Sequence, residues 1–565
     1  MNLLLLLLIL VPLIAAAIIA FMPAFAAKFW ALGASLLVLL MCAGIASQFY
    51  FKLDLSLVPA ENRLATTVQV SLGGEPDSPF SIDQIGFRLH LGADTISLWL
   101  VVLTALLTPL AILASFGSIK TREKEYYAWM LVLLAAMLGV FVARDLLLFY
   151  IFFELTLIPM FFIIGIWGGP ERRFAAGKFF LFTFAGSVFT LAGVVYLGLQ
   201  AKTFDLTNVT LYAQEHLNDS QRFWILLAFL AGFAVKVPLF PVHTWLPLAH
   251  TEAPTAGSVI LAGVLLKLGT YGLLRLAVPV GLLSETGLTS THLLTVVHVL
   301  AVLCVIGIIY GALVAWVQRD IKKLVAYSSV SHLGFCVLGL LALNPAGLQG
   351  SVLYMINHGL STGALFLVIG MIYDRYHTRD IDQLSGLARI MPKLAFFFVF
   401  FALSSIGLPG LNGFPSEFMT VLGAFTSPIL GIKYGVFAAL GVILGAVYMM
   451  HMLARVLFGP VKVPADHSHD SHSSHGDDHG HAAPVKNDIN GREVAILVPL
   501  AMCCLLLGVP AWMMRTMTAP LELLRPTTPA SNVTLVQPNL DRVVYDGVDH
   551  KDASTDQALL NMQIR

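Results

Sequence analysis

Charged residues are scarce in this 565-residue chain: Asp, Glu, Lys and Arg make up 12% of it, about half the share found in soluble globular domains. Hydrophobic residues make up 58%, and the mean hydropathy is +0.83. This composition excludes a water-soluble globule and indicates a polytopic membrane protein. The net charge is zero, which removes any whole-chain argument for nucleic acid as a partner.

Cysteine is also rare, and its spacing carries no redox motif. The five cysteines lie in apolar stretches without a Cys-x-x-Cys pair, so neither a disulfide framework nor an iron–sulfur site is indicated. A Walker loop, a dinucleotide fingerprint and a metalloprotease helix are absent from the sequence too. The chain is therefore not expected to bind nucleotide or to carry out redox chemistry alone.

Long apolar runs are what the sequence has instead. Runs of about 18 or more apolar residues, enough to cross a bilayer, occur about fourteen times and predict an all-α polytopic membrane protein. They lie near residues 2–22, 27–48, 92–116, 127–143, 146–168, 176–199, 222–241, 255–279, 292–316, 323–343, 348–373, 394–414, 432–458 and 494–514. The first run ends in small residues, as a signal peptide does, but no positive residue precedes Lys28. We interpret it as the first membrane helix.

Lysine and arginine gather in the loops after odd-numbered helices, for example at Lys120, Arg172 and Lys322. Because such loops stay cytoplasmic, both termini are expected on the outer, periplasmic face of a bacterial-type inner membrane. The loop over 49–91 is expected on that face. Its alternating apolar residues over 66–72 predict a hairpin.

Two predicted helices are interrupted, the seventh by Pro238 and Pro241 and the twelfth by the sequence Leu408-Pro409-Gly410. Paired interrupted helices indicate a repeated transporter core, and an offset of five helices predicts that the two five-helix repeats are inverted. The expected organisation is helices 1–3 over 1–126, a first repeat over 127–280, a second repeat over 292–458, a histidine-rich cytoplasmic loop over 459–493, a last helix over 494–514 and a polar tail over 515–565.

Six ionisable side chains fall inside the predicted helices. Burying a charge at membrane depth costs about 2.5 to 3.5 kcal/mol on insertion scales, so such residues mark an ion path by default. A buried lysine whose carboxylate partner approaches or recedes changes its proton affinity, and histidine passes protons between such sites. The candidates for a proton path are Glu154, Lys236, Lys267, His332, His358 and Glu417.

A simpler interpretation exists for each of these residues. A single intramembrane histidine can serve only as a hydrogen-bond partner between helices, and a glutamate or lysine near a helix end can extend its charge to the lipid headgroups. A purely structural membrane spacer is therefore an alternative. It predicts that the charged residues can be replaced together without functional loss.

Long motifs surround these residues. One runs from Lys236 to Pro247 (KVPLFPVHTWLP), a second from Ala249 to Pro254 (AHTEAP), a third from Lys267 to Gly272 (KLGTYG) and a fourth from Lys322 to Gly334 (KKLVAYSSVSHLG). With them the chain resembles the antiporter-like membrane subunits of respiratory complex I, over roughly residues 90–515.

The resemblance implies a role for each candidate. Glu154 would be the partner of Lys236, Lys267 the central lysine and Glu417 the terminal site for proton exit. The two histidines, His332 and His358, would carry protons across the midplane. Glu417 also separates the chain from the L and N subunits of that family, which are expected to carry a lysine in the twelfth helix.

The resemblance also implies the surroundings of the chain. Protons would move through a hydrated Glu/Lys/His axis, driven by quinone reduction elsewhere in an NADH:quinone oxidoreductase. No cofactor is expected in this chain; FMN, iron–sulfur clusters and quinone would belong to partner subunits. The expected partners are L-like and N-like antiporter-like subunits and the lipid bilayer. Multi-subunit Na⁺/H⁺ antiporters and membrane-bound hydrogenases share the motifs and are the alternative.

Two features depart from the family pattern. Leu248 stands after Trp-Leu-Pro, where the family often has an acid, so no carboxylate role is assigned in that loop. The histidine-rich insertion is either a solvated flexible loop or a site for Zn²⁺ or Ni²⁺. Its histidines are His467, His469, His472, His475, His479 and His481.

Overall fold

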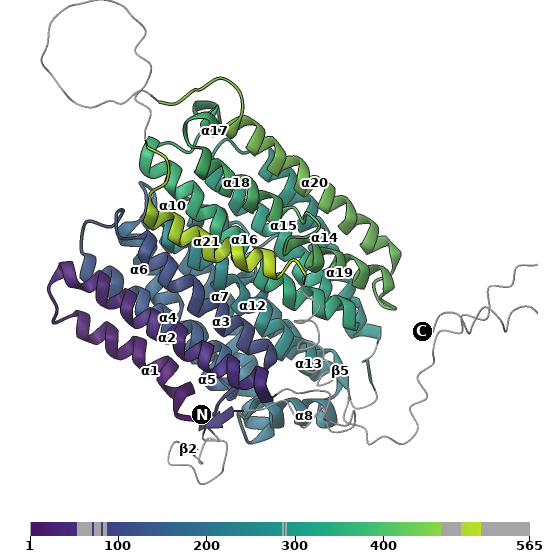
Figure 1. Cartoon of the computed structure of the whole chain (residues 1–565). Coiled ribbons are helices and arrows are strands. Elements are labelled where there is room, and N and C mark those ends of the chain that lie inside the picture. Colours follow the sequence, from purple (N-terminus) through teal and green to yellow (C-terminus); the bar gives the residue numbers. More distant parts are fainter. Residues whose placement is uncertain are drawn as a thin grey trace, which may run out of the picture. The chain divides into compact units, whose positions relative to one another are not determined.

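A computed structural model of the chain describes residues 2–52, 70–72, 81–82, 87–284, 287–288, 291–464 and 487–509. Within these residues, ten helices are long and apolar enough to cross a membrane. They lie side by side as a bundle (Figure 1). The predicted all-α polytopic membrane fold is confirmed at this level. The histidine-rich insertion, the polar tail and residues 66–69 of the predicted hairpin lie outside the described residues.

The helices up to and just beyond the first interruption alternate long membrane spans with short pieces. They are α1 (Asn2–Ile19), α2 (Ala24–Lys52), α3 (Thr95–Ala114), α4 (Glu123–Val142), α5 (Leu146–Leu155), α6 (Leu157–Trp167), α7 (Arg172–Ala201), α8 (Leu206–His216), α9 (Asp219–Lys236) and α10 (Trp245–Glu252).

The remaining helices include one span that is partly π-helical. They are α11 (Thr255–Ile260), η2 (Leu261–Leu265), α12 (Leu266–Gly272), η3 (Leu273–Ala277), α13 (Val278–Gly281), α14 (Thr291–Trp316), α15 (Ile321–Leu341), α16 (Pro345–Tyr376), η4 (Ile381–Gln383), α17 (Leu387–Ile390), α18 (Pro392–Ser405), α19 (Gly413–Thr426), α20 (Ile432–Leu457) and α21 (Gly491–Leu506).

Among the described residues, three antiparallel strand pairs lie in the connections. They are β1 (Val70–Leu72) with β4 (Leu91–Ala93), β2 (Ser81–Ile82) with β3 (Phe87–Arg88), and β5 (Leu283–Ser284) with β6 (Gly287–Leu288).

The chain leaves the helical path at both predicted interruptions. Between Lys236 at the end of α9 and Trp245 at the start of α10 it contains Pro238 and Pro241. Between α18 and α19 it contains Pro409. Proline lacks the backbone donor that a continuous helix requires. The freed backbone groups need polar partners at membrane depth, so each interruption lies where polar side chains gather.

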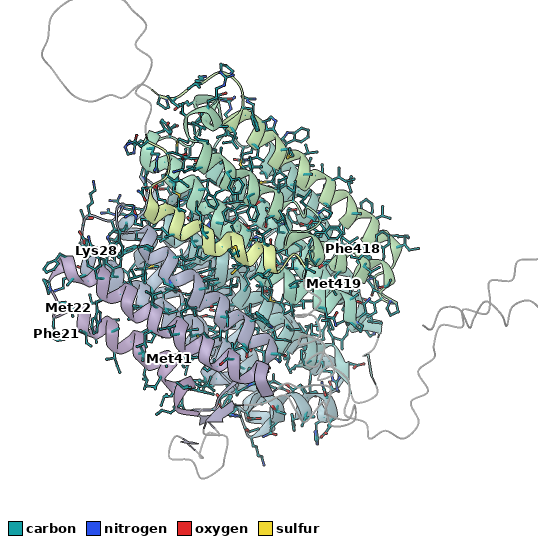
Figure 2. All side chains as sticks on the ribbon, in the orientation of Figure 1. Phe21, Met22, Lys28, Met41, Phe418 and Met419 are labelled. Carbon is teal, nitrogen blue, oxygen red and sulfur yellow. The ribbon has the colours of Figure 1, made fainter. Side chains whose placement is uncertain are left out.

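The core is built from the span over 255–281 and from α15 and α16. In their most apolar stretches, 94% or more of the residues are buried within this chain, against 28% in α2 and 33% in α14. The outer helices therefore expose apolar side chains on the surface of this chain. On α19, which Figure 2 shows with its side chains, Phe418 is 55% exposed and the adjacent Met419 is buried.

Aspartates begin several helices. The side chains of Asp145 and Asp320 accept hydrogen bonds from the first backbone amides of α5 and α15, which is the usual way to satisfy the free donors of a helix start. The backbone of Asp145 forms an isolated antiparallel β-bridge with that of Asp205. The backbone of Asp320 forms the same kind of bridge with that of Asp380, at the same sequence spacing. Asp205 precedes α8 and Asp380 lies shortly before α17, and these two helices lie at opposite ends of the bundle (Figure 1).

Candidate functional site

Lys236 ends α9 at the first interruption, and its side chain is 2% exposed. Its Nζ donates a hydrogen bond to Thr156 Oγ1 at 3.1 Å and lies 4.6 Å from the centroid of the Phe153 ring. Thr156 stands at the junction of α5 and α6. A hydroxyl acceptor and an aromatic face together stabilise an ammonium group that is removed from water.

Glu154 is half-buried on α5, two residues before Thr156 at the junction. The charges of Glu154 and Lys236 influence each other through space. The hydrogen bond of Lys236 nevertheless goes to Thr156, and Glu154 Oε1 has no hydrogen-bond partner within the described part of the chain. The pair is therefore close enough to influence each other's charge but is not in direct contact.

Lys267 is fully buried in α12, between the π-helical turns η2 and η3. Its Nζ donates to the backbone carbonyl of Ala262 and lies 2.7 Å from His358 Nδ1 on α16. A π-helical turn widens the helix and disturbs its regular hydrogen bonding, which brings the Ala262 carbonyl within reach of the ammonium group. The helix itself thus provides part of the lysine site.

His358, His332 and Glu417 continue from Lys267 as a connected row. The rings of His358 and His332 are 5.7 Å apart between centroids. His332 Nδ1 lies 2.6 Å from the Tyr354 hydroxyl, and that hydroxyl donates to Glu417 Oε1 at 2.9 Å. His332 Nδ1 is itself 3.7 Å from Glu417 Oε1. Four of the six predicted residues therefore lie in one continuous polar cluster, together with Tyr354.

A small cavity of about 10 Å³ lies within this cluster. This volume is close to the smallest that can hold a single water. His332, His358 and Glu417 line it, with polar side chains from three helices. The other polar lining residues are Tyr354, Asn357, Ser361, Ser404, Ser405 and Ser416. These polar side chains offer a water enough hydrogen-bond partners to connect the two histidines with the carboxylate of Glu417.

Four site residues were missing from the sequence-based set. Thr156 and Tyr354 contact Lys236 and Glu417, and the Tyr448 hydroxyl lies 3.2 Å from His332 Nε2. His250 on α10 is fully buried, stacks on a Phe366 ring and has no hydrogen-bond partner on either ring nitrogen within the described residues. The sequence held one sign that Tyr354 belongs to the site, because this residue stands one helical turn before His358. It held no such sign for Tyr448, whose hydroxyl comes from a helix far away in the sequence.

Within the described residues, no group of three or more His, Cys, Asp or Glu side chains is arranged to hold a metal ion. The histidines proposed for Zn²⁺ or Ni²⁺ lie outside those residues.

Comparison with known proteins identifies the architecture. A family model described as NADH:quinone oxidoreductase/Mrp antiporter, TM, matches residues 143–444, and one for the amino terminus of NADH-ubiquinone oxidoreductase chain 4 matches residues 78–141. NADH-quinone oxidoreductase subunit M of Rhodobacter capsulatus is 44% identical over 75% of this chain and 79% of its own length. NADH-ubiquinone oxidoreductase chain 4 of Marchantia polymorpha is 41% identical over 75% and 79%.

Solved structures show the same fold. A chain of respiratory complex I from Thermus thermophilus superposes with a TM-score of 0.75 at 28% identity, covering 92% of this chain and 98% of its own. A chain of the Mrp complex from a Dietzia species reaches 0.73 at 21% identity, with 93% and 97% covered. Fold and site together define an antiporter-like membrane subunit. Within that class, the chain belongs to the family of NADH-quinone oxidoreductase subunit M and NADH-ubiquinone oxidoreductase chain 4.

Proposed function

We propose that this chain is a proton-translocating membrane subunit of a complex I type NADH:quinone oxidoreductase. The observation that carries the proposal is the row from Lys267 through His358, His332 and Tyr354 to Glu417, with contacts of 2.7, 2.6 and 2.9 Å at three of its steps and 5.7 Å between the ring centroids of the two histidines. All five side chains are buried, so the row is a polar path through an otherwise apolar core.

Each group in the row has a chemical role. Lys267 and Glu417 change charge when they gain or lose a proton, while the two histidines and the Tyr354 hydroxyl accept and donate between them. Lys236, under the influence of Glu154, is proposed to load the lysine side of the path. We propose that a change of charge at Glu154 and Lys236 alters the proton affinity of Lys267 through the low-dielectric core.

The finer architecture is part of the proposal. We propose fourteen membrane helices with two inverted five-helix repeats, with the seventh helix formed by α9 and α10 and the twelfth by α18 and α19. Two matched backbone hydrogen bonds, one beside each of these β-bridges, support the proposed repeat. Leu146 N donates to Phe204 O at 2.7 Å, and Ile321 N donates to Arg379 O at 2.9 Å, at the same spacing in the chain. The two bridges lie with α8 and α17, at opposite ends of the bundle (Figure 1), as inversion requires.

The setting of the subunit is proposed by analogy with its relatives. The R. capsulatus protein is named as a subunit of an NADH-quinone oxidoreductase, so quinone reduction and its flavin, iron–sulfur and quinone groups are assigned to partner chains. The exposed apolar faces of α2, α7 and α14 then meet lipid or L-like and N-like subunits. Both chain termini are proposed on the outer face of a bacterial-type inner membrane.

A multi-subunit Na⁺/H⁺ antiporter is the second candidate, because the family description includes Mrp antiporters and a Mrp chain shares the fold. The two candidates differ in what drives the protons. Membrane vesicles that contain the native complex are the test. Flavin and iron–sulfur subunits that copurify with this chain, together with proton uptake that starts only on NADH addition, support the oxidoreductase. Proton-coupled sodium efflux without NADH oxidation would support the antiporter.

A further inference from the structure

Two asparagines bind each other's main chain where α16 passes the second interruption. The Asn357 side-chain nitrogen on α16 donates to the main-chain carbonyl of Asn412, the last residue before α19. The Asn412 side-chain nitrogen donates to the main-chain carbonyl of Asn357 at 3.3 Å. We call these two hydrogen bonds the asparagine latch. Asn357 is 1% exposed and Asn412 is fully buried, so both bonds lie in the low-dielectric core.

Further hydrogen bonds fix the orientation of both asparagines. The same nitrogen of Asn357 also donates to Ser416 Oγ on α19 at 3.1 Å. The Asn412 side-chain oxygen accepts from Ser404 Oγ on α18, and its backbone nitrogen donates to the Cys504 carbonyl on α21 at 3.1 Å. The asparagine latch therefore joins α16 to the helices on both sides of the interruption.

The interruption in turn places the carboxylate of Glu417. Gly407 lies within the interruption with a φ of 73°, and a Cβ at this position would strike Glu417 Oε2. The other oxygen, Glu417 Oε1, accepts from the Tyr354 hydroxyl of α16 at 2.9 Å. One carboxylate oxygen thus lies against the interruption and the other meets α16. A shift of α16 relative to the interruption would therefore change the distance between Tyr354 and Glu417.

Asn357 stands between Tyr354 and His358 on α16. Residues three apart on a helix lie on the same side of it, so Tyr354 and Asn357 are neighbours, and His358 follows directly. Asn357 also lines the small cavity, together with His332 and Glu417. The asparagine latch thus fixes α16 at the level of the polar row.

We propose that Asn357 is a positioning residue for proton transfer to Glu417. Through the asparagine latch it holds the second interruption at the distance from α16 at which the Tyr354 hydroxyl reaches the carboxylate. Asn357 passes no proton itself, because a side-chain amide keeps both of its hydrogens. This inference rests on the proposed function, since the exact position of Glu417 matters only if this residue exchanges protons.

A purely structural role is the alternative, because an interrupted helix frees backbone groups that need partners at membrane depth. Asn344, at the start of α16, offers a matched comparison. Its side-chain nitrogen donates to the Gly423 carbonyl at 2.8 Å, which joins α16 to α19 by the same kind of bond. Gly423 lies about 9 Å beyond Glu417 along the helix axis. A structural role predicts similar consequences for both asparagines, whereas a positioning role predicts that only Asn357 affects proton transfer.

The test uses the purified complex in liposomes, with protons moved per NADH oxidised as the first measurement. Asn357→Ala should slow proton transfer to Glu417 by about ten- to a hundredfold and lower this ratio as far as Tyr354→Phe does. Asn344→Ala should keep the ratio of the unmodified complex, even if its melting temperature falls as much. Asn412→Ala removes the return bond of the latch and should also lower the ratio, which provides a second reading if Asn357→Ala does not assemble.

Infrared difference spectra report the position of the carboxyl group directly. The carboxyl band of Glu417 is the one that Glu417→Gln removes. Loss of the hydrogen bond from Tyr354 weakens the hold on this carboxyl group, so its band should shift in Tyr354→Phe. Asn357→Ala should shift the band in the same direction, while Asn344→Ala should leave it in place.

Two results would overturn the proposal: an assembled Asn357→Ala complex with an unchanged ratio and an unshifted band, or an Asn344→Ala complex that loses as much proton transfer as Asn357→Ala. Failure of the proposed function gives a different result. In that case Tyr354→Phe would itself leave the ratio unchanged in a complex that assembles and oxidises NADH.

Discussion

Lys267 and His358 meet where the π-helical span crosses α16, with Lys267 Nζ 2.7 Å from His358 Nδ1. At this distance both groups cannot easily carry a proton, because two positive charges would lie in direct contact in the buried core. When Lys267 donates, His358 Nδ1 accepts and the remaining ring proton stands on Nε2, which has no partner within the described residues. The contact therefore allows the two groups to share one proton.

Glycine packing sets the distance between these two residues. A Cβ on Gly359 would lie 2.8 Å from the Gly263 carbonyl oxygen and 2.8 Å from Leu103 Cδ2. We expect Gly359→Ala to destabilise the subunit by about 1 to 3 kcal/mol and to slow proton uptake, since α16 must move away from Lys267. Thermal unfolding and NADH-driven proton uptake of the purified complex measure both effects.

Gly363→Ala is the matched control, one turn further along α16. Its Cβ would meet nothing closer than 3.7 Å, so stability and proton uptake should stay near the unmodified values. Equal damage from both substitutions would show that the close approach at Gly359 does not set the contact.

Tyr354 joins His332 to Glu417, and its hydroxyl is expected to be essential to the path. Tyr354→Phe leaves the buried carboxylate without its donor, a loss of about 1 to 3 kcal/mol, and breaks the row between His332 and Glu417. We expect proton transfer between these two residues to slow by at least about tenfold, which lowers the number of protons moved per NADH oxidised. Tyr448→Phe is the comparison, because Tyr448 contacts His332 at 3.2 Å; a larger loss in Tyr448→Phe than in Tyr354→Phe would argue against the row.

Thr156 is the hydrogen-bond acceptor of Lys236. Thr156→Val keeps the shape of the side chain but removes the oxygen, so we expect an unpartnered buried ammonium, a cost of about 1.5 to 3 kcal/mol and slower proton uptake. Thr156→Ser keeps the oxygen and should restore most of the rate. The rate of proton uptake in liposomes compares the two variants. A serine variant as slow as the valine variant would contradict the role of the Thr156 oxygen as the acceptor for Lys236.

Acid stability depends in part on Asp205 at the start of α8. Burial alone would raise the pKa of Asp205, but hydrogen bonds from His90 and from the amides of Asn208 and Thr207 lower it. A lowered folded-state pKa stabilises the fold above the unfolded value of about 3.9 and the contribution is lost as the pH falls below it. Asp205→Asn keeps a capping side chain but no charge.

We therefore expect the unmodified complex to lose more stability than Asp205→Asn when the pH is lowered from about 5 to 3, because the contribution of the carboxylate is lost only below the unfolded value. Thermal unfolding at several pH values checks this. An Asp205→Asn complex whose melting temperature falls as steeply as that of the unmodified complex would show that the carboxylate does not contribute.

The sequence predicted much of this molecule because the bilayer leaves few choices. Apolar run length indicated the spans, and the prolines near Lys236 and Glu417 indicated both interruptions. Charges at membrane depth were visible as exceptions, which is why Lys267, His358, His332 and Glu417 were found before their contacts were known. Orientation and the repeat remain predictions that the structure does not test.

What the sequence could not predict are contacts that depend on side-chain geometry. Glu154 was expected to pair with Lys236, but the ammonium group turns to Thr156, a hydroxyl that looks ordinary within an apolar run. The π-helical turns around Lys267 have no composition signal, and α8 over 206–216 is too polar to be counted with the spans. Tyrosines 354 and 448 lie on apolar helices, where an aromatic residue is usually part of the core.

The central claim is that Lys267 passes protons and is more than a fixed charge, and Lys267→Arg tests this most directly. Arginine keeps the positive charge but does not release its proton. Protons moved per NADH oxidised should be measured in liposomes that contain the complete complex. The account predicts a lower ratio for Lys267→Arg than for the unmodified complex; an unchanged ratio would contradict it.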